Sequence, residues 1–375
     1  RPNTLFASRV ARFFDFNPGE TLDDDAIEAT LATDSVNAIT GMFAGRDLQI
    51  FTKGGEFFIS QASLDPITPN NLVVSTATRR GSKEGIKPVG AESGTLFIQR
   101  AGKSLREFLF SDVELSYISN NISLLSSHLL RSPSDMALRK ATSTDDGDLL
   151  LLVNSTDGSL ATYSILRGQN VIAPSLSTTD GEFVNVAVDV DTIYFVIKRT
   201  INSTTKYYVE AFNDDNTTDS NVLLSGASLP GTTTVTGLSH LEGETVKVIV
   251  DDLMQTNKTV SSGQITLDSV PTSYVEIGLD FTPEIKTLPV ELKLPSGNVL
   301  AQKKRILEAT ANMYLTQNLT LNGSDFLFTA GDFYTGLKRR KPILGYDRRG
   351  QLTFSQSQPL FFTLLGIEYK VSVGQ

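Results

Sequence analysis

The sequence of 375 residues contains no cysteine, no tryptophan and only two histidines, His128 and His240. The absence of cysteine excludes disulfide scaffolds, thiolate zinc sites, iron–sulfur clusters and cysteine nucleophiles. Two histidines are too few for a metal centre that is built from several imidazole ligands. A chain of this length buries about three quarters of its unfolded surface, so its core needs neither a disulfide nor a metal.

Long apolar runs and positive net charge are also missing. The richest apolar stretch, residues 359–367, is much shorter than the roughly 20 residues that a membrane-spanning helix needs. Lys and Arg number 33 against 42 Asp and Glu, a formal charge of −9. This balance disfavours a protein that grips nucleic acid, although a passage for moving DNA must not be strongly basic either. The first residues, Arg-Pro-Asn, lack a methionine or signal-peptide pattern, so we expect the numbering to begin inside a longer product.

What the sequence does contain is strand signals. Short alternating, β-branched or aromatic runs recur between turns of Gly, Asn, Asp and Ser. Four predicted hairpins start near Asp47, Thr95, Asp148 and Asp191, and a further short apolar stretch precedes each of them. One inner strand followed by a hairpin at intervals of roughly 40–50 residues is typical of propeller blades. A meandering sandwich with accidental spacing is the alternative.

The pattern changes after a polar segment at residues 213–225. We predict an all-β fold, in which propeller-like repeats of short strands at residues 1–227 are followed by one or two small β-sandwich or barrel domains at 228–283 and 284–375. Longer strands are predicted in the last part, at 305–315, 326–329, 351–356 and 360–373. The only predicted helix is a short one at 123–130.

Motifs that carry chemistry are missing. The sequence has no G-x-S-x-G, no P-loop and no G-x-G-x-x-G. The acidic segment Asp145-Asp146-Gly147-Asp148 comes nearest to a calcium loop, but a solvated hairpin turn is the favoured interpretation. His240, in a Gly-bounded segment, and His128 are expected to be structural. We therefore predict no enzyme, no catalytic residue, no cofactor and no metal site.

Basic residues gather in the last 75 residues of the chain. They are candidates for contact with a neighbouring subunit, an adaptor protein or phosphate. A solvated face, or charge balance between strands, is the alternative for each cluster. The residues chosen as candidates are Lys338, Arg339, Arg340, Lys341, Arg348 and Arg349.

Three blocks of residues carry a resemblance to a known family. They read SVNAITGMFAGRDLQIFTKGGEFF at 35–58; PITP at 66–69 with LFIQRAGKSLRE at 96–107; and GLSHLEGETVKV at 237–248 with VEIGLD at 275–280 and KTLP at 286–289. In this order they resemble the tail nozzle proteins, or tail tubular proteins B, of short-tailed bacteriophages and prophages. Members of that family are usually much longer, so we expect this chain to be a fragment or a reduced version.

The resemblance implies a virion structural protein that is assembled in the host cytoplasm. It implies a ring of identical subunits, six-fold in the family, around a channel through which the genome leaves the tail. The expected partners are further copies of the chain, the tail adaptor protein, a tail fibre protein, and viral DNA that passes without sequence-specific binding. Two alternatives stay open: a tail-associated carbohydrate-binding or receptor-binding β-propeller protein, and a propeller scaffold in a cellular complex.

Overall fold

The computed structural model describes residues 1–32, 37–60, 66–92, 94–143, 146–291, 293–294, 297–298, 302–341 and 345–374. Within these ranges the only helical elements are three-residue 3-10 turns: η1 (Ser127–Leu129), η2 (Arg167–Gln169), η3 (Gly226–Ser228) and η4 (Ser239–Leu241). None of the described helices is long and apolar enough to cross a bilayer. The predicted all-β class is confirmed. The chain forms two compact units, Arg1–Arg199 with Thr205–Phe212 and Thr200–Thr204 with Asn213–Gln375.

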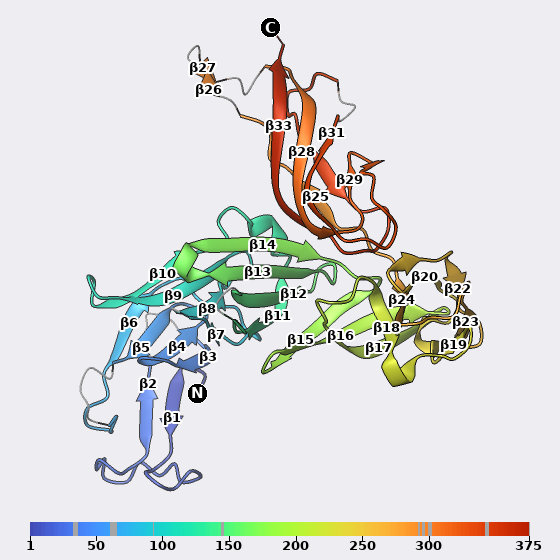
Figure 1. Ribbon diagram of the computed structural model, residues 1–375. Coiled ribbons are helices and arrows are strands. Elements are labelled where there is room, and N and C mark those ends of the chain that lie inside the picture. The colour runs from blue at the N-terminus through green and yellow to red at the C-terminus, as the bar shows by residue number, and fades with distance from the viewer. Residues whose placement is uncertain are drawn as a thin grey trace. The chain divides into compact units, whose positions relative to one another are not determined.

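The first unit contains four antiparallel meanders that follow one another in chain order (Figure 1). A short hairpin of β1 (Thr4–Ala7) and β2 (Ile27–Thr30) precedes them. The meanders are β3 (Ile39–Ala44), β4 (Leu48–Thr52), β5 (Glu56–Ile59) and β6 (Val74–Thr78); β7 (Val89–Gly90), β8 (Thr95–Ile98), β9 (Leu105–Ser111) and β10 (Ser116–Asn121); β11 (Pro133–Arg139), β12 (Asp148–Asn154), β13 (Leu160–Leu166) and β14 (Val171–Ser177); and β15 (Glu182–Asp189), β16 (Thr192–Ile201) and β17 (Thr204–Ala211).

The four predicted hairpins correspond to β4–β5, β8–β9, β12–β13 and β16–β17, and the apolar stretches before them are β3, β7, β11 and β15. Their turns use residues that tolerate positive φ. Between β16 and β17, Asn202 and Ser203 have φ of 48° and 61°, as a two-residue type I′ turn requires at both central positions.

Successive sheets of the first unit pack face to face, because alternate side chains of a strand point to opposite faces. In β4, Phe51 packs with Phe97 and Phe108 of the second sheet, whereas its neighbour Ile50 packs toward the β1–β2 hairpin with Leu5. The second sheet buries its other face against the third, and the third sheet buries its other face against the fourth. This stacking of three four-stranded meanders and one three-stranded meander confirms the propeller-like repeats. No buried cluster of the described residues joins the fourth sheet to the first.

The second unit has two hydrophobic cores. One core is surrounded by a five-stranded sheet and a two-stranded pair. The sheet contains β18 (Asp219–Ser225), β24 (Tyr274–Leu279), β20 (Thr245–Val250), β21 (Leu253–Met254) and β22 (Lys258–Thr259), and the pair is β19 (Thr234–Thr236) with β23 (Gln264–Thr266). The other core lies between two sheets, β25 (Glu284–Lys286), β32 (Thr353–Ser355), β29 (Thr320–Leu321) and β30 (Ser324–Asp325), and β31 (Tyr334–Arg340), β28 (Lys304–Thr316) and β33 (Thr363–Val373). A small hairpin joins β26 (Lys293–Leu294) to β27 (Gly297–Asn298).

Some local expectations were wrong. The segment expected as a helix at 123–130 has only the 3-10 turn η1. The N–H groups of Ser126, Leu129 and Leu130 bond carbonyls three residues before them, as in turns, and not four as in an α-helix. Residues 326–329 form no strand, although Phe326 is buried in the last core. The expected domain ranges 1–227, 228–283 and 284–375 stay predictions, but β18 pairs with β24 and so shares a sheet of the second unit.

The stacking of the sheets predicts where the first unit is sensitive to truncation. Leu152 lies between the second and third sheets with no exposed surface, so Leu152→Ala leaves a cavity. We expect the free energy of unfolding to fall by about 2–5 kcal/mol in chemical denaturation. Leu125 is 94% exposed, and Leu125→Ala is the matched control, expected within about 0.5 kcal/mol of the parent. Equal losses in the two variants would contradict the buried position of Leu152.

Candidate functional site

The structure separates the candidate basic residues into three environments. Lys338, Arg339 and Arg340 lie on β31, Lys341 follows it directly, and Arg348 and Arg349 lie in the segment before β32. Along a strand, alternate side chains point to opposite faces of the sheet. The predicted run of four basic residues is therefore not a single patch.

Lys338 is used within its own domain. Its Nζ atom donates a hydrogen bond to the Leu327 carbonyl at 2.6 Å and lies 4.1 Å from the centre of the Tyr334 ring and 5.0 Å from that of Phe328. Tyr334 and Phe328 pack against the last core. The aliphatic part of Lys338 thus covers the core, and its ammonium contacts a carbonyl and two aromatic rings of the same domain.

Arg339 is on the opposite, open face of the β31–β28–β33 sheet. Glu308 of β28 lies 3.4 Å from Arg339 Nε and 3.1 Å from Lys370 Nζ of β33, so one carboxylate stands between two cations. The ammonium of Lys370, then Arg339 and Lys341, lower the pKa of Glu308 below its ordinary value. Both cations remain about two-thirds exposed and can meet a partner. The sequence did not single out Lys370, because register alone brings it opposite Glu308.

Arg348 and Arg349 are exposed beside a structured carboxylate. Asp347 accepts the backbone N–H groups of Arg349 at 3.0 Å and Gly350 at 3.3 Å, and these two bonds lower the pKa of Asp347. The Asp347 and Lys304 backbones also exchange hydrogen bonds of 2.7 and 2.8 Å. Asp347 therefore fixes this segment, and the two arginine side chains are left on the surface.

A second signal in the sequence supports these surface cations. Residues 284–375 contain twelve Lys and Arg against seven Asp and Glu, a net charge of +5, so the preceding 283 residues carry −14. The last part of the chain is therefore basic and the rest acidic. The surface formed by Leu337, Arg339, Lys341, Leu365 and Lys370 is called the basic face below.

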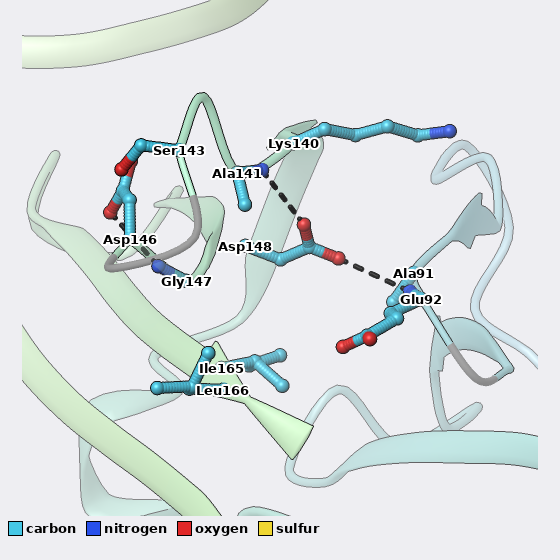
Figure 2. Close-up of a pocket in the computed structure, with 10 residues that line it drawn as sticks. All are labelled: Ala91, Glu92, Lys140, Ala141, Ser143, Asp146, Gly147, Asp148, Ile165 and Leu166. Atoms are coloured by element: carbon cyan, nitrogen blue, oxygen red, sulfur yellow. Dashed lines mark hydrogen bonds between the residues drawn. The ribbon is translucent and has the colours of Figure 1, made fainter. Parts of the chain in front are cut away.

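The acidic segment near Asp148 borders a hollow of about 480 Å³ in the first unit (Figure 2). The two Asp148 oxygens accept the backbone N–H groups of Ala141 at 3.0 Å and Glu92 at 3.1 Å. Asp146 lies 3.2 Å from Arg139, and Asp145 is outside the described residues. Asp148 thus joins the loops of two neighbouring sheets, and Asp146 makes its contacts within the third sheet and its loop.

Neither a metal site nor a histidine site emerges from the part of the chain that the structure describes. No group of three His, Cys, Asp or Glu residues there is placed to hold a metal ion. The Nε2 atom of His240 lies 3.2 Å from the Ser220 carbonyl, in the turn η4, and His128 lies in the turn η1. The His240 contact agrees with a structural role, whereas His128 is exposed.

Comparison with known proteins does not identify a family for this chain. No protein-family model and no curated protein matches the chain. Among solved structures, the exo-β-1,3-galactanase of Phanerochaete chrysosporium aligns over 98% of this chain and 93% of its own in one complex with β-1,3-galactotriose, with 8% identity and a TM-score of 0.26. Its galactose complex gives 8% identity and 0.24, over 99% and 94%. A GH31 α-xylosidase of Xanthomonas citri gives 11% identity and 0.14, over 64% and 35%. At such TM-scores these likenesses carry no argument about function.

The position of Glu308 predicts its titration. A carboxyl whose pKa is lowered in the folded state stabilises that state above the ordinary Glu value of about 4.3, and this contribution is lost as the pH falls through the lower folded value. Because Lys370 is the largest cause, we expect Lys370→Met to raise the Glu308 midpoint in a carboxyl NMR titration. Lys286→Met, in another sheet of the same unit, is the control and leaves the midpoint unchanged. An unmoved midpoint in Lys370→Met would show that the ion pair does not form.

Proposed function

We propose that this chain is a structural subunit of a bacteriophage tail nozzle and has no catalytic role. Copies of it assemble into a ring, six-fold as in the family it resembles, whose channel lets the genome leave the virion. The resemblance of the blocks at 35–58, 96–107 and 237–248 supports this proposal. The surrounding partners are the tail adaptor protein and a tail fibre protein.

One observation carries the proposal: the stack of sheets in the first unit ends on an open face with exposed apolar side chains. Ile193 and Phe195 of β16 pack against the third sheet, so Tyr194 points to the other face of the fourth sheet. Phe212 packs on Phe195 after β17, which places Tyr207 and Val209 on the same outer face as Tyr194.

Tyr194, Tyr207 and Val209 are 38%, 64% and 75% exposed. The three preceding sheets bury both of their faces, whereas this sheet buries one. Contiguous exposed apolar surface marks a protein–protein contact, and copies of one chain in a ring supply such a contact for every subunit.

The distribution of charge suits a passage for DNA. The net charge of −14 on residues 1–283 repels phosphate, so a channel lined by this part of the chain would hold DNA weakly. The basic residues of the last domain then serve contacts with other subunits or with the adaptor. The Lys338 ammonium already donates to the Leu327 carbonyl, so we assign that role to the other candidate cations.

A carbohydrate-binding tail protein is the second candidate. The exposed rings of Tyr194 and Tyr207 on one sheet face favour it. A tyrosine ring offers an apolar surface and its hydroxyl a hydrogen-bonding group, and a hydrated sugar can use both. Binding to a glycan array by the monomeric chain, lost in Tyr207→Ala, would support this candidate against the nozzle.

Negative-stain imaging of the full chain, alone and mixed with the tail adaptor protein, tests the proposed function. We expect rings with a central hole wide enough for duplex DNA. A chain that stays monomeric at every concentration and never joins the adaptor would overturn the proposal.

The open face of the fourth sheet gives a sharper test of assembly. Val209→Asp places a charge on this face, so we expect the fraction of chains in rings to fall about tenfold or more, because an unpaired charge is costly to bury in an interface. Val113→Asp, at a position 95% exposed elsewhere in the unit, is the matched control and leaves ring formation intact. Equal ring formation by both variants would show that the face of the fourth sheet is not a subunit contact.

A further inference from the structure

A loop at residues 8–26, between β1 and β2, presents phenylalanines to solvent. Phe13, Phe14 and Phe16 are 80%, 97% and 53% exposed, and Val10 is 68% exposed. Four large apolar side chains within seven residues form a protruding surface of the kind that is buried by a partner. This segment is called the aromatic loop below.

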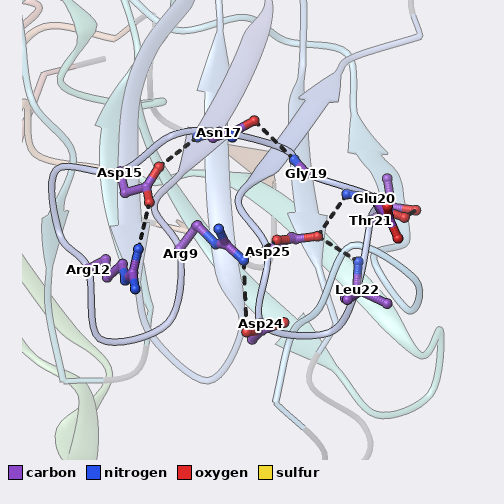
Figure 3. Close-up of polar contacts among 10 residues, drawn as sticks. All are labelled: Arg9, Arg12, Asp15, Asn17, Gly19, Glu20, Thr21, Leu22, Asp24 and Asp25. Atoms are coloured by element: carbon purple, nitrogen blue, oxygen red, sulfur yellow. Dashed lines mark hydrogen bonds and ion pairs between the residues drawn. The ribbon is translucent and has the colours of Figure 1, made fainter.

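Polar contacts hold the aromatic loop in one shape (Figure 3). The nearly buried carboxylate of Asp25 lies 2.5 Å from Arg9 and accepts the backbone N–H groups of Glu20 at 3.1 Å and Leu22 at 2.9 Å. Gly19 has φ of 52°, and a Cβ atom there would lie 2.5 Å from the Asp25 carboxylate, so the turn requires glycine. Because these bonds exist before any contact, little ordering of the loop remains when it binds.

The surroundings of the phenylalanines are acidic. The loop contains two arginines against five carboxylates, and both arginines are paired inside it, Arg9 with Asp24 and Asp25 and Arg12 with Asp15. A partner for this surface must offer apolar side chains with cations around them. An anionic lipid surface is negatively charged like the loop itself, so it is disfavoured as a partner.

The chain itself has such a partner in the basic face. On the open side of the β31–β28–β33 sheet, Leu337 and Leu365 are 65% and 61% exposed. Arg339 lies two residues from Leu337 on the same side of β31, Lys341 follows the strand, and Lys370 lies across β28. Exposed leucines with cations toward one end of the face complement exposed phenylalanines among carboxylates, both in apolar character and in charge.

We propose that the aromatic loop of one copy docks on the basic face of a second copy. This inference rests on the proposed ring, for which it names one pair of contacting surfaces. The two surfaces differ, so the contact is heterologous, and repetition of such a contact closes a ring when its rotation divides the full circle. The phenylalanines supply apolar burial, and the acidic rim and the cations set orientation and association rate.

Photo-crosslinking between differently labelled copies tests the proposal directly. The full chain carrying p-benzoyl-phenylalanine at position 14 is prepared without label, mixed with the parent chain grown in ¹⁵N, and irradiated. We expect mixed light and heavy crosslinks that map to residues 334–341 or 363–373. Crosslinks within one copy, or between copies at other segments, would overturn the proposal.

Charge exchange gives a second test with its own rescue. We expect Arg339→Glu with Lys341→Glu to weaken self-association about tenfold or more in sedimentation velocity. Glu20→Lys with Asp23→Lys in the loop should restore it when the four changes are combined. Phe13→Ser with Phe14→Ser should weaken it likewise, whereas Val113→Ser, at another exposed position, should not. Each change is at the surface, so unchanged thermal unfolding shows that the fold is kept.

The outcomes separate this inference from the proposed function. Rings that form normally in Phe13→Ser with Phe14→Ser overturn the docking contact and leave the nozzle proposal standing. Crosslinked pairs that never close into rings support the contact and argue against the nozzle. Binding of the full chain to phosphatidylcholine vesicles that depends on Phe13 and Phe14, without crosslinks between copies, overturns the docking contact in favour of a membrane.

Discussion

A sheet stacked between two others has to be apolar on both faces, and the first unit depends on this constraint. In β12, Leu150 and Leu152 face the second sheet, while Leu151 and Val153 face the fourth. The strand therefore reads as a continuous apolar run rather than an alternating one. Burial on both faces also couples the sheets to one another, because each cluster contains side chains from two successive sheets.

The same constraint creates a problem of register. When both faces are apolar, a shift by one residue exposes no hydrophobic side chain, so apolar patterning alone does not fix the pairing. Polar groups at the strand ends supply the missing specificity. Asp148 at one end of β12 binds two backbone N–H groups of separate loops, and Asn154 at the other end accepts the Arg131 N–H at 2.9 Å and donates to the Leu129 carbonyl at 2.9 Å. Asp148 and Asn154 thus fix the register at the two ends of β12.

The four sheets of the first unit form an open stack, so the first and the last sheet each have an outer face that no further sheet of the stack covers. The β1–β2 hairpin covers the outer face of the first sheet, but Tyr207 and Val209 of the fourth sheet stay exposed. The aromatic loop and the basic face add two more surfaces with exposed apolar side chains. Residues 1–283 and 284–375 carry opposite net charges, which favour a contact between the acidic part of one copy and the basic part of another over a contact between two equal parts. A contact between two different surfaces is the type that generates a ring of identical subunits.

The sequence by itself determined the all-β class and the positions of the four hairpins, because strand patterns and turn residues such as Asn202 act over a few neighbouring positions. It also located the basic residues, but not their roles. Only the tertiary structure decided that Lys338 turns inward onto Tyr334, that Lys370 stands opposite Glu308, and that β18 joins β24. These outcomes depend on which strands pair and in which register. Pairing between strands far apart in the sequence is set by the energy of the whole core, and a local sequence pattern does not contain that information.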